Sequence, residues 1–161
     1  METKKLEKAR AAFETMCKAY DKFQLEYDVV DQDERFVVIT GLQSDSGQNI
    51  LMLIAIEPEM EKIRVLSKVN CKIAENMEMD IAIAINSINL RLVRGFYTYT
   101  VSNSEPSISF ELPNSIVGVI PGEEVFLDLL LAAFSTTKEY HDKLMLLANG
   151  TISLDKFLSL E

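Results

Sequence analysis

The sequence has few of the residues on which enzymatic and metal chemistry usually depends. It contains one histidine, His141, and two cysteines, Cys17 and Cys71, with no CxxC pair and no histidine cluster. A zinc site needs several thiolate or imidazole ligands at short spacings. The two cysteines could form a disulfide, but one lies in a predicted helix and the other at the end of a predicted strand. We therefore expect free thiols, no metal and no cofactor.

Long apolar runs are also absent. Uncharged apolar runs such as residues 81–85 and 129–134 fall far short of the roughly 20 apolar residues that cross a bilayer as a helix. Residues 1–14 contain no apolar core of signal-peptide length. We therefore expect a cytoplasmic protein that contacts no membrane.

Basic residues are in the minority. The chain has 16 Lys and Arg against 25 Asp and Glu, a formal charge of −9. A nucleic-acid-binding protein needs a basic surface over the phosphates, so we expect no nucleic-acid partner. Because 48% of the residues are apolar, the chain is globular. Its 161 residues suit one domain, which we expect to span residues 1–161.

Recognisable catalytic motifs are missing as well. The sequence has no GxSxG elbow, no Walker loop and no GxGxxG. His141 lies in a predicted helix beside Tyr140, Asp142 and Lys143, and its simplest interpretation is a histidine that faces solvent. The alternative is a small enzyme or ligand-binding protein whose site is assembled around His141 from residues distant in sequence. That alternative predicts a deep polar pocket at His141, whereas a protein-binding module predicts a shallow apolar groove.

What the sequence does contain is a regular series of helix and strand patterns. Apolar residues spaced by three and four predict helices at residues 4–23, 79–94 and 123–148, and a short final turn through residue 158. Residues 136–139 could act as a capping box and divide the long helix, but we favour a single or kinked helix. Aromatic and β-branched runs between polar turns predict strands at residues 25–30, 35–42, 50–56, 62–69, 96–101 and 107–112.

These patterns predict an α+β fold. Short turns join most successive strands, so we expect a mostly antiparallel sheet with helices packed against it, in the order α-β-β-β-(β)-α-β-β-α. The strand of residues 50–56 reads ILMLIAI. It is too apolar to be half exposed, and we therefore expect it at the centre of the sheet.

The helix predicted at residues 79–94 carries more apolar surface than one packed face requires. Four apolar residues follow the spacing of a single helical face: Ile81, Ile85, Ile88 and Leu92. Most of the remaining circumference is apolar too, and such a helix is buried on more than one side. We expect one side to pack on the sheet. On the other side, Ile83, Ser87 and Leu90 are the candidate contacts of a homodimer.

Four polar or aromatic residues near this helix have two interpretations each. Asn86 and Asn89 either bond to nearby backbone at the corner between helix and hairpin, or fix the register of a dimer, as a buried Asn does in some helical pairs. Tyr97 and Tyr99 either serve as core and cross-strand pairs, or line an apolar groove for an extended peptide. The second interpretation makes both tyrosines candidate partner contacts.

Two stretches of the chain form a recognisable pattern: Asn86-Ser87-Ile88-Asn89 followed by Arg94-Gly95-Phe96, and TTKEYHDKLMLLANGTIS at residues 136–153. In both, the chain resembles the YbjN-like bacterial proteins, and the second stretch resembles the closing helix of that family. These proteins are similar in fold to type III secretion chaperones, which are commonly dimers with the mid-chain helix near the dimer contact. The resemblance implies a binding or regulatory module with no known chemistry.

The sequence therefore predicts a non-enzymatic, cytoplasmic protein-binding module, chaperone-like or regulatory, that acts as a homodimer with an unidentified protein partner. A third possibility is a part of a larger assembly, in which the face of residues 125–134 docks on another chain.

Overall fold

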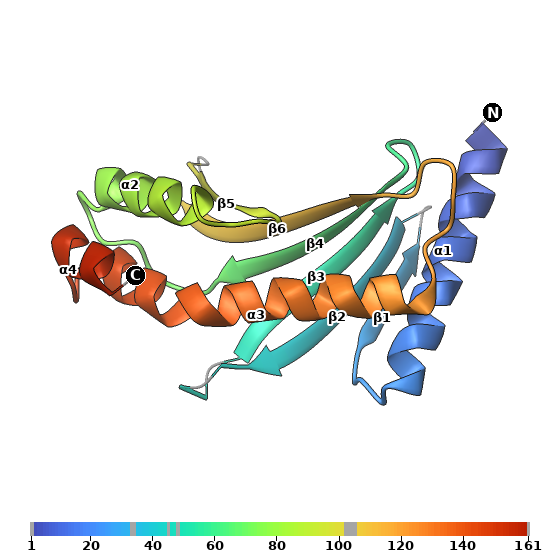
Figure 1. The fold of residues 1–161 in the computed structure, drawn as a ribbon, viewed down its shortest axis with the longest axis horizontal. Coiled ribbons are helices and arrows are strands. Elements are labelled where there is room, and N and C mark those ends of the chain that lie inside the picture. Colours follow the sequence, from blue (N-terminus) through green and yellow to red (C-terminus); the bar gives the residue numbers. More distant parts are fainter. Residues whose placement is uncertain (1, 33–34, 45, 48, 102–105, 161) are drawn as a thin grey trace.

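One antiparallel sheet organises the fold. A computed structural model describes residues 2–32, 35–44, 46–47, 49–101 and 106–160. The strands pair in the order β1-β2-β3-β4-β6-β5 (Figure 1). Their bounds are β1 (Asp28–Gln32), β2 (Arg35–Gln43), β3 (Asn49–Glu57), β4 (Lys62–Val69), β5 (Phe96–Thr100) and β6 (Ser107–Ser115). The helices are α1 (Glu2–Lys22), α2 (Glu78–Asn89), α3 (Glu123–Ala148) and α4 (Leu154–Ser159). This architecture confirms the predicted α+β class.

The predicted bounds hold for some elements and shift for others. β4 coincides with its prediction, but the strand predicted at residues 25–30 begins only at Asp28. The chain first closes the end of α1 there, since the Leu25 N–H donates to the Tyr20 carbonyl at 3.1 Å. α3 runs unbroken from Glu123 to Ala148. The favoured single helix is therefore right, and the alternative in which residues 136–139 divide it is wrong. The turns predicted at residues 31–34, 44–47 and 103–106 each include residues outside the described ranges.

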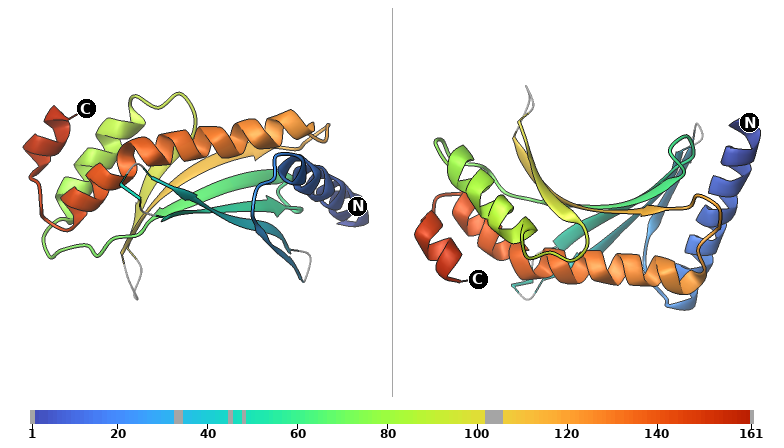
Figure 2. Two further views of the ribbon diagram at one scale, coloured as in Figure 1. Left: turned by 90° about the horizontal axis from the view of Figure 1, so that it is seen from below. Right: turned by 45° about the horizontal axis from the view of Figure 1, so that its top comes forward.

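The core lies between one face of the sheet and the helices. α1 and α3 pack on this face and on each other (Figure 2). The Phe13 ring of α1 stands 5.5 Å from the Phe36 ring of β2, centroid to centroid. Alternate strand residues are buried beneath the helices, among them Val38, Ile54, Val65, Phe110 and Leu112.

The opposite face of the sheet carries no helix among the described elements (Figure 2). It is mixed in character, with apolar residues such as Leu51 and Leu53 on β3 and charged residues such as Arg64 on β4. β3 does lie centrally, as predicted, but only one of its faces is covered. Leu51 is exposed and Leu53 is half-buried. The expectation that so apolar a strand cannot be half exposed is therefore wrong.

An ion network crosses this open face. The Arg64 guanidinium on β4 donates to both carboxylate oxygens of Glu111 on β6, and to Glu57 on β3, each at 2.9 Å. Paired, fork-shaped bonds of this kind fix geometry as well as charge. The network links three adjacent strands, and its single guanidinium balances one of the two carboxylate charges.

Candidate protein-binding surface

The inner face of α2 is part of the core. Ile81, Ala84, Ile85 and Ile88 are buried, and the helix packs on β5, α3 and α4. The spacing of these residues places them on one side of the helix, as the sequence predicted. One apolar side of α2 therefore packs in the core, as the sequence predicted.

α2 ends at Asn89, five residues before the predicted end at residue 94. The Asn89 amide explains why. Its Nδ2 donates to the Tyr97 carbonyl at 2.9 Å, and its Oδ1 accepts from the Tyr97 N–H at 2.7 Å. These two backbone groups belong to β5, at the edge of the sheet, where a strand lacks a second neighbour. Asn89 thus takes the place of a neighbouring strand, and the backbone interpretation is right for this residue.

Gly95 forms the corner between α2 and β5. Its φ is +73°, in the left-handed region that favours glycine. A Cβ added there would stand 2.4 Å from Cζ of Phe110 and 2.7 Å from the Glu111 carbonyl oxygen. Both the backbone conformation and the close approach of β6 therefore require glycine.

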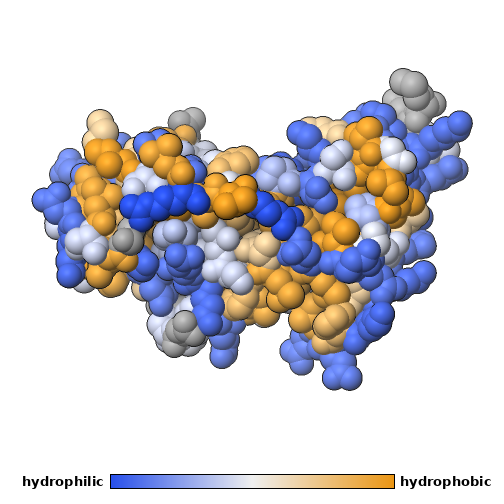
Figure 3. All heavy atoms as spheres, viewed as in Figure 1, coloured by the Kyte–Doolittle hydropathy of each residue, from blue (hydrophilic) through white to orange (hydrophobic). Residues whose placement is uncertain are grey.

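The outer face of α2 carries a second row of apolar side chains. We call the outer stripe the set of Met79, Ile83, Asn86, Leu90 and Val93. Its apolar members are exposed: Met79 71%, Ile83 43%, Leu90 80% and Val93 96%. At 3.6 residues per turn, Met79, Ile83 and Asn86 lie opposite the buried face of α2, and Leu90 and Val93 follow in the turn after the helix. Apolar side chains gather over α2 in the space-filling view (Figure 3).

The other predicted contacts lie differently. Ser87 is half-buried at the flank of α2. Tyr97 is buried, its ring lies 5.1 Å from that of Phe110, and its hydroxyl donates to the Thr136 carbonyl at 3.3 Å. It belongs to the core and cannot line a groove for a peptide, which corrects its assignment as a partner contact.

Tyr99 lies at the margin of the outer stripe. It lines a hollow of about 500 Å³ together with Met79 and Ala82 of α2. Burial of the hydroxyl raises the pKa of Tyr99, and the nearby carboxylate of Glu78 raises it further. Tyr99 is the one of the two tyrosines that remains next to the exposed surface of α2.

His141 is fully buried, so the expectation of a solvent-facing histidine is wrong. It lies on the buried face of α3, four residues after Thr137 and three before Leu144. Its Nδ1 lies 2.9 Å from a carboxylate oxygen of the adjacent Asp142. A side chain enclosed in this way does not reach a substrate in solution. The structure thus places His141 in the core.

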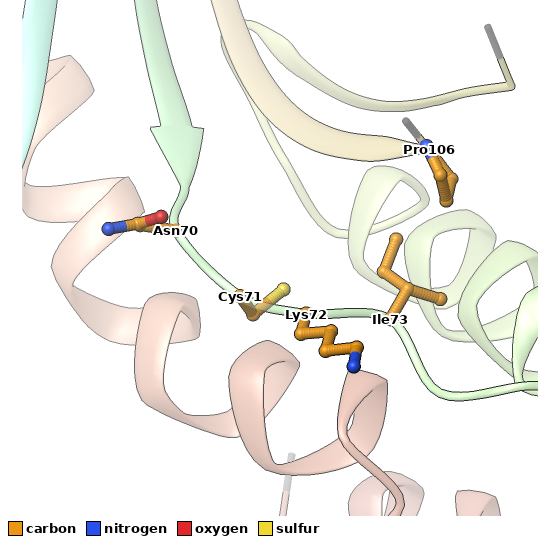
Figure 4. A pocket seen from close by; sticks show the side chains of 5 residues that line it. All are labelled: Asn70, Cys71, Lys72, Ile73 and Pro106. Atoms are coloured by element: carbon orange, nitrogen blue, oxygen red, sulfur yellow. The ribbon is translucent and has the colours of Figure 1, made fainter. Parts of the chain in front are cut away.

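A hollow near the start of β6 offers little chemistry. It measures about 450 Å³ and is lined by Asn70, Cys71, Lys72, Ile73 and Pro106 (Figure 4). Burial raises the pKa of the Cys71 thiol, although Lys68 opposes this shift. The thiol is therefore protonated at neutral pH and is a poor nucleophile. No disulfide joins Cys17 and Cys71.

The described residues form neither a metal site nor a membrane-spanning helix. No three His, Cys, Asp or Glu side chains in this part of the chain come together as a metal site would require. Nor does any helix in the described ranges have the length and apolar character of a membrane-spanning segment.

Comparison with known proteins gives likeness in structure and none in sequence. No family model matches the chain, and no curated protein matches it. YbjN, a proposed transcription regulator from E. coli, superposes with a TM-score of 0.59 at 11% identity, over 86% of this chain and 92% of YbjN. A chain of the ExsC–ExsE complex superposes with a TM-score of 0.56 at 9% identity, over 85% of this chain and 96% of that one.

The chain has a YbjN-like, secretion-chaperone-like fold. The likeness covers most of both chains, so it concerns the whole arrangement of sheet and helices. It confirms the resemblance found in the sequence at the level of the YbjN-like fold.

Proposed function

We propose that this protein is a non-enzymatic, cytoplasmic protein-binding module, chaperone-like or regulatory, that acts as a homodimer through the outer stripe of α2. Ile83 and Leu90 make the central contacts, Ser87 lies at the flank, and Tyr99 lies at the margin. The same molecule binds a further protein whose identity the sequence does not specify.

The observation that carries this proposal is the outer stripe itself. Soluble monomers rarely expose a continuous apolar row, and exposed patches of this kind mark interaction sites. Four large apolar side chains point outward from one helix and the turn that follows it. Their burial by a partner would contribute on the order of 1.5–3 kcal/mol for each side chain that becomes fully covered.

The structural likeness supports a binding role in a more general way. ExsC was crystallised in a complex with ExsE, so one protein of this fold binds another protein. A shared fold is a weak argument for a shared activity. The argument for this chain therefore rests on its own exposed residues.

The alternative, an enzyme or ligand-binding protein with a site around His141, has less support. That alternative predicts a deep polar pocket at His141, but the His141 side chain is fully buried on the inner face of α3. A site around His141 also does not explain why α2 exposes a row of apolar side chains.

The test is the mass of the protein in solution. We expect size-exclusion chromatography with light scattering to give twice the chain mass of 18.2 kDa at micromolar concentration. Ile83→Asp places an unpaired carboxylate in an apolar contact in both copies. We expect it to weaken the dimer at least 100-fold, about 2.7 kcal/mol, while the circular dichroism spectrum stays unchanged.

Val119→Asp is the matched control. Val119 is also exposed, and it lies in the connection between β6 and α3, at the end of the molecule away from α2 (Figure 1). This variant should remain a dimer. A wild-type mass of 18.2 kDa, or equal dissociation of both variants, would contradict the proposal.

A further inference from the structure

We infer that α4 is a ligand built into the chain: it occupies an apolar site on α2 and α3, and a short helix of a protein partner takes this site when α4 detaches. This inference rests on the protein-binding role proposed above, for which it names a second surface, and it does not depend on the homodimer. The partner helix is amphipathic and carries a phenylalanine, because α4 itself shows what the site accepts.

Phe157 holds α4 in place. Within α4, whose six residues are all described, Phe157 alone is fully buried. α4 packs on α2 and on α3, and it lies beside the end of α3 (Figures 1 and 2). Every buried residue of α2 is apolar, and so is every buried residue of α3 after His141. The ring of Phe157 therefore fills an apolar site formed by two helices from distant parts of the chain.

Few polar bonds fasten α4 to the rest of the molecule. The turn after α3 is closed as far as Ile152, since the Thr151 and Ile152 N–H groups both donate to the Leu146 carbonyl, at 2.9 and 3.2 Å. Beyond this turn, one hydrogen bond joins residues 153–160 to another part of the described chain. In it, Lys143 Nζ donates to the Leu160 carbonyl at 3.3 Å, in an exposed position. A segment with so few buried contacts opens at a lower free-energy cost than the whole fold.

α4 is also too short to persist as a helix once it detaches. It has six residues, and isolated helices shorter than about 12–15 residues are marginal in water. Its cap, in which the Ser153 hydroxyl accepts from the Lys156 N–H at 3.3 Å, lies within the same segment. Detachment therefore converts α4 into an unstructured segment and uncovers the apolar site.

The sequence of α4 describes the helix that would compete for this site. Leu154 is half-buried and lies three residues before Phe157, so both can face the site, as the anchors of a helix docked in a groove do. Lys143 lies at the C-terminal end of α4, where a cation favours the negative end of the helix dipole. We therefore expect the partner helix to begin at a Ser or Asp cap, to carry a phenylalanine four residues later, and to end beside Lys143.

Peptide binding to the full chain tests the inference. The probe is a synthetic peptide of residues 151–160, and nuclear magnetic resonance of the labelled protein follows its binding. In the wild-type chain, α4 is present at an effective concentration on the order of millimolar and competes with the probe. Phe157→Ala in the chain removes this competition, so we expect the probe to bind this variant at least about 10-fold more tightly than wild type. The shifted signals should lie in α2 and at the end of α3.

Two controls match this comparison. Leu160→Ala in the chain removes an aliphatic side chain that is 43% exposed, and this variant should bind the probe as weakly as wild type. A probe that carries Phe157→Ala should bind neither protein. Circular dichroism checks that the Phe157→Ala chain keeps its fold.

Hydrogen exchange of the wild-type chain is a test that needs no variant. We expect the amides of Phe157 and Leu160 to exchange at least about 100-fold faster than those of Leu144 and Leu147, because α4 opens while α3 stays folded. Equal protection of the two helices would show that α4 opens only with the whole fold, and would overturn the inference.

The remaining outcomes separate this inference from the proposed function. Equal binding of both probes to Phe157→Ala, or binding of neither, overturns the inference and leaves the mass of the wild-type dimer unaffected. Loss of the dimer in Phe157→Ala, with an unchanged circular dichroism spectrum, would show that α4 of a second copy occupies the site, and overturns the inference too. A wild-type monomer contradicts the proposed homodimer alone.

Discussion

Two asparagines three residues apart in α2 have opposite surroundings. Asn89 bonds both backbone groups of Tyr97, whereas Asn86 faces outward in the middle of the outer stripe. The sequence left both interpretations open for both residues, because an amide inside an apolar helix can serve either purpose. The position of the helix end decides between them, and the sequence placed that end five residues too late.

Alanine substitutions should separate the two residues. In the Ile83→Asp background, where we expect a monomer, Asn89→Ala should lower the free energy of unfolding by about 1–3 kcal/mol, since it leaves two edge groups of β5 unpaired. Asn86→Ala should change it by less than about 0.5 kcal/mol, as for other exposed sites. Urea unfolding at neutral pH measures both. Equal losses would mean that the bonds of Asn89 contribute nothing specific.

Glycine at position 95 should be similarly hard to replace. In Gly95→Ala the new methyl group meets Phe110 and the Glu111 carbonyl, and the residue must hold φ at +73°. We expect a loss of more than about 3 kcal/mol, because a contact this close adds to the roughly 1–2 kcal/mol of the left-handed conformation. Gly118→Ala isolates the second effect, since its φ is +84° and nothing lies within 4 Å of its Cβ. That control should lose only about 1–2 kcal/mol, and a similar loss for both would refute the steric argument.

At the scale of elements, α2 depends on its surroundings. It is 12 residues long, its N-cap residue Met77 makes no side-chain cap bond, and it has no basic residue in its last turn. Helices this short are marginal in water on their own. Packing against β5, α3 and α4 therefore stabilises the helix, which explains why local sequence patterns alone misplaced its end.

The burial of His141 in α3 could have been predicted from the spacing of apolar residues in the sequence. His141 falls within the buried three-and-four spacing of Thr137, Tyr140 and Leu144. The polarity of histidine suggested solvent, but position on the apolar face was the stronger indicator. The bond between His141 and Asp142 could not have been read from spacing, because adjacent helical residues do not usually share a face.

A carboxylate links α3 to the hairpin between β2 and β3. Burial alone would raise the pKa of Asp142, but hydrogen bonds from His141 and Ser46, with the charge of His141, outweigh burial and lower it. A pKa that is lower in the folded state stabilises the fold above the unfolded pKa of about 3.9. This stabilisation is lost as pH falls through the lower folded pKa.

We therefore expect part of the acid sensitivity to depend on Asp142. Between about pH 5 and pH 3, the free energy of unfolding of wild type should fall more steeply than that of Asp142→Asn. Urea unfolding at a series of pH values compares the two slopes. Asp155→Asn, a change at an exposed carboxylate of α4, is the control and should follow wild type. Parallel curves for wild type and Asp142→Asn would remove this role for the carboxylate.

At the scale of the molecule, the sequence predicted the class of fold and most of the order of elements. Hydrophobic periodicity and turns sufficed for β4, for α3 and for the central place of β3. They did not predict that none of the described helices covers the second face of the sheet, because alternation along a strand does not say which layers are present. The outer stripe was predicted in part: Ile83 and Leu90 lie on it, whereas Tyr97 turned out to be core.

The molecule therefore presents two regions on which a protein could dock: the outer stripe, and the face of the sheet on which none of the described helices packs. The proposed homodimer would cover the first, which leaves the second for the further protein of the proposed function.

The way α2 is fastened has a thermodynamic consequence. Asn89 holds the backbone of Tyr97, and the hydroxyl of Tyr97 reaches across to α3 at Thr136. These bonds tie the end of α2 to β5 and to α3, so the proposed dimer contact would need little ordering of the helix on docking. We therefore expect association to be close to rigid-body docking. Its heat-capacity change should be negative and should reflect the apolar surface buried at the contact, with no further contribution from folding of α2.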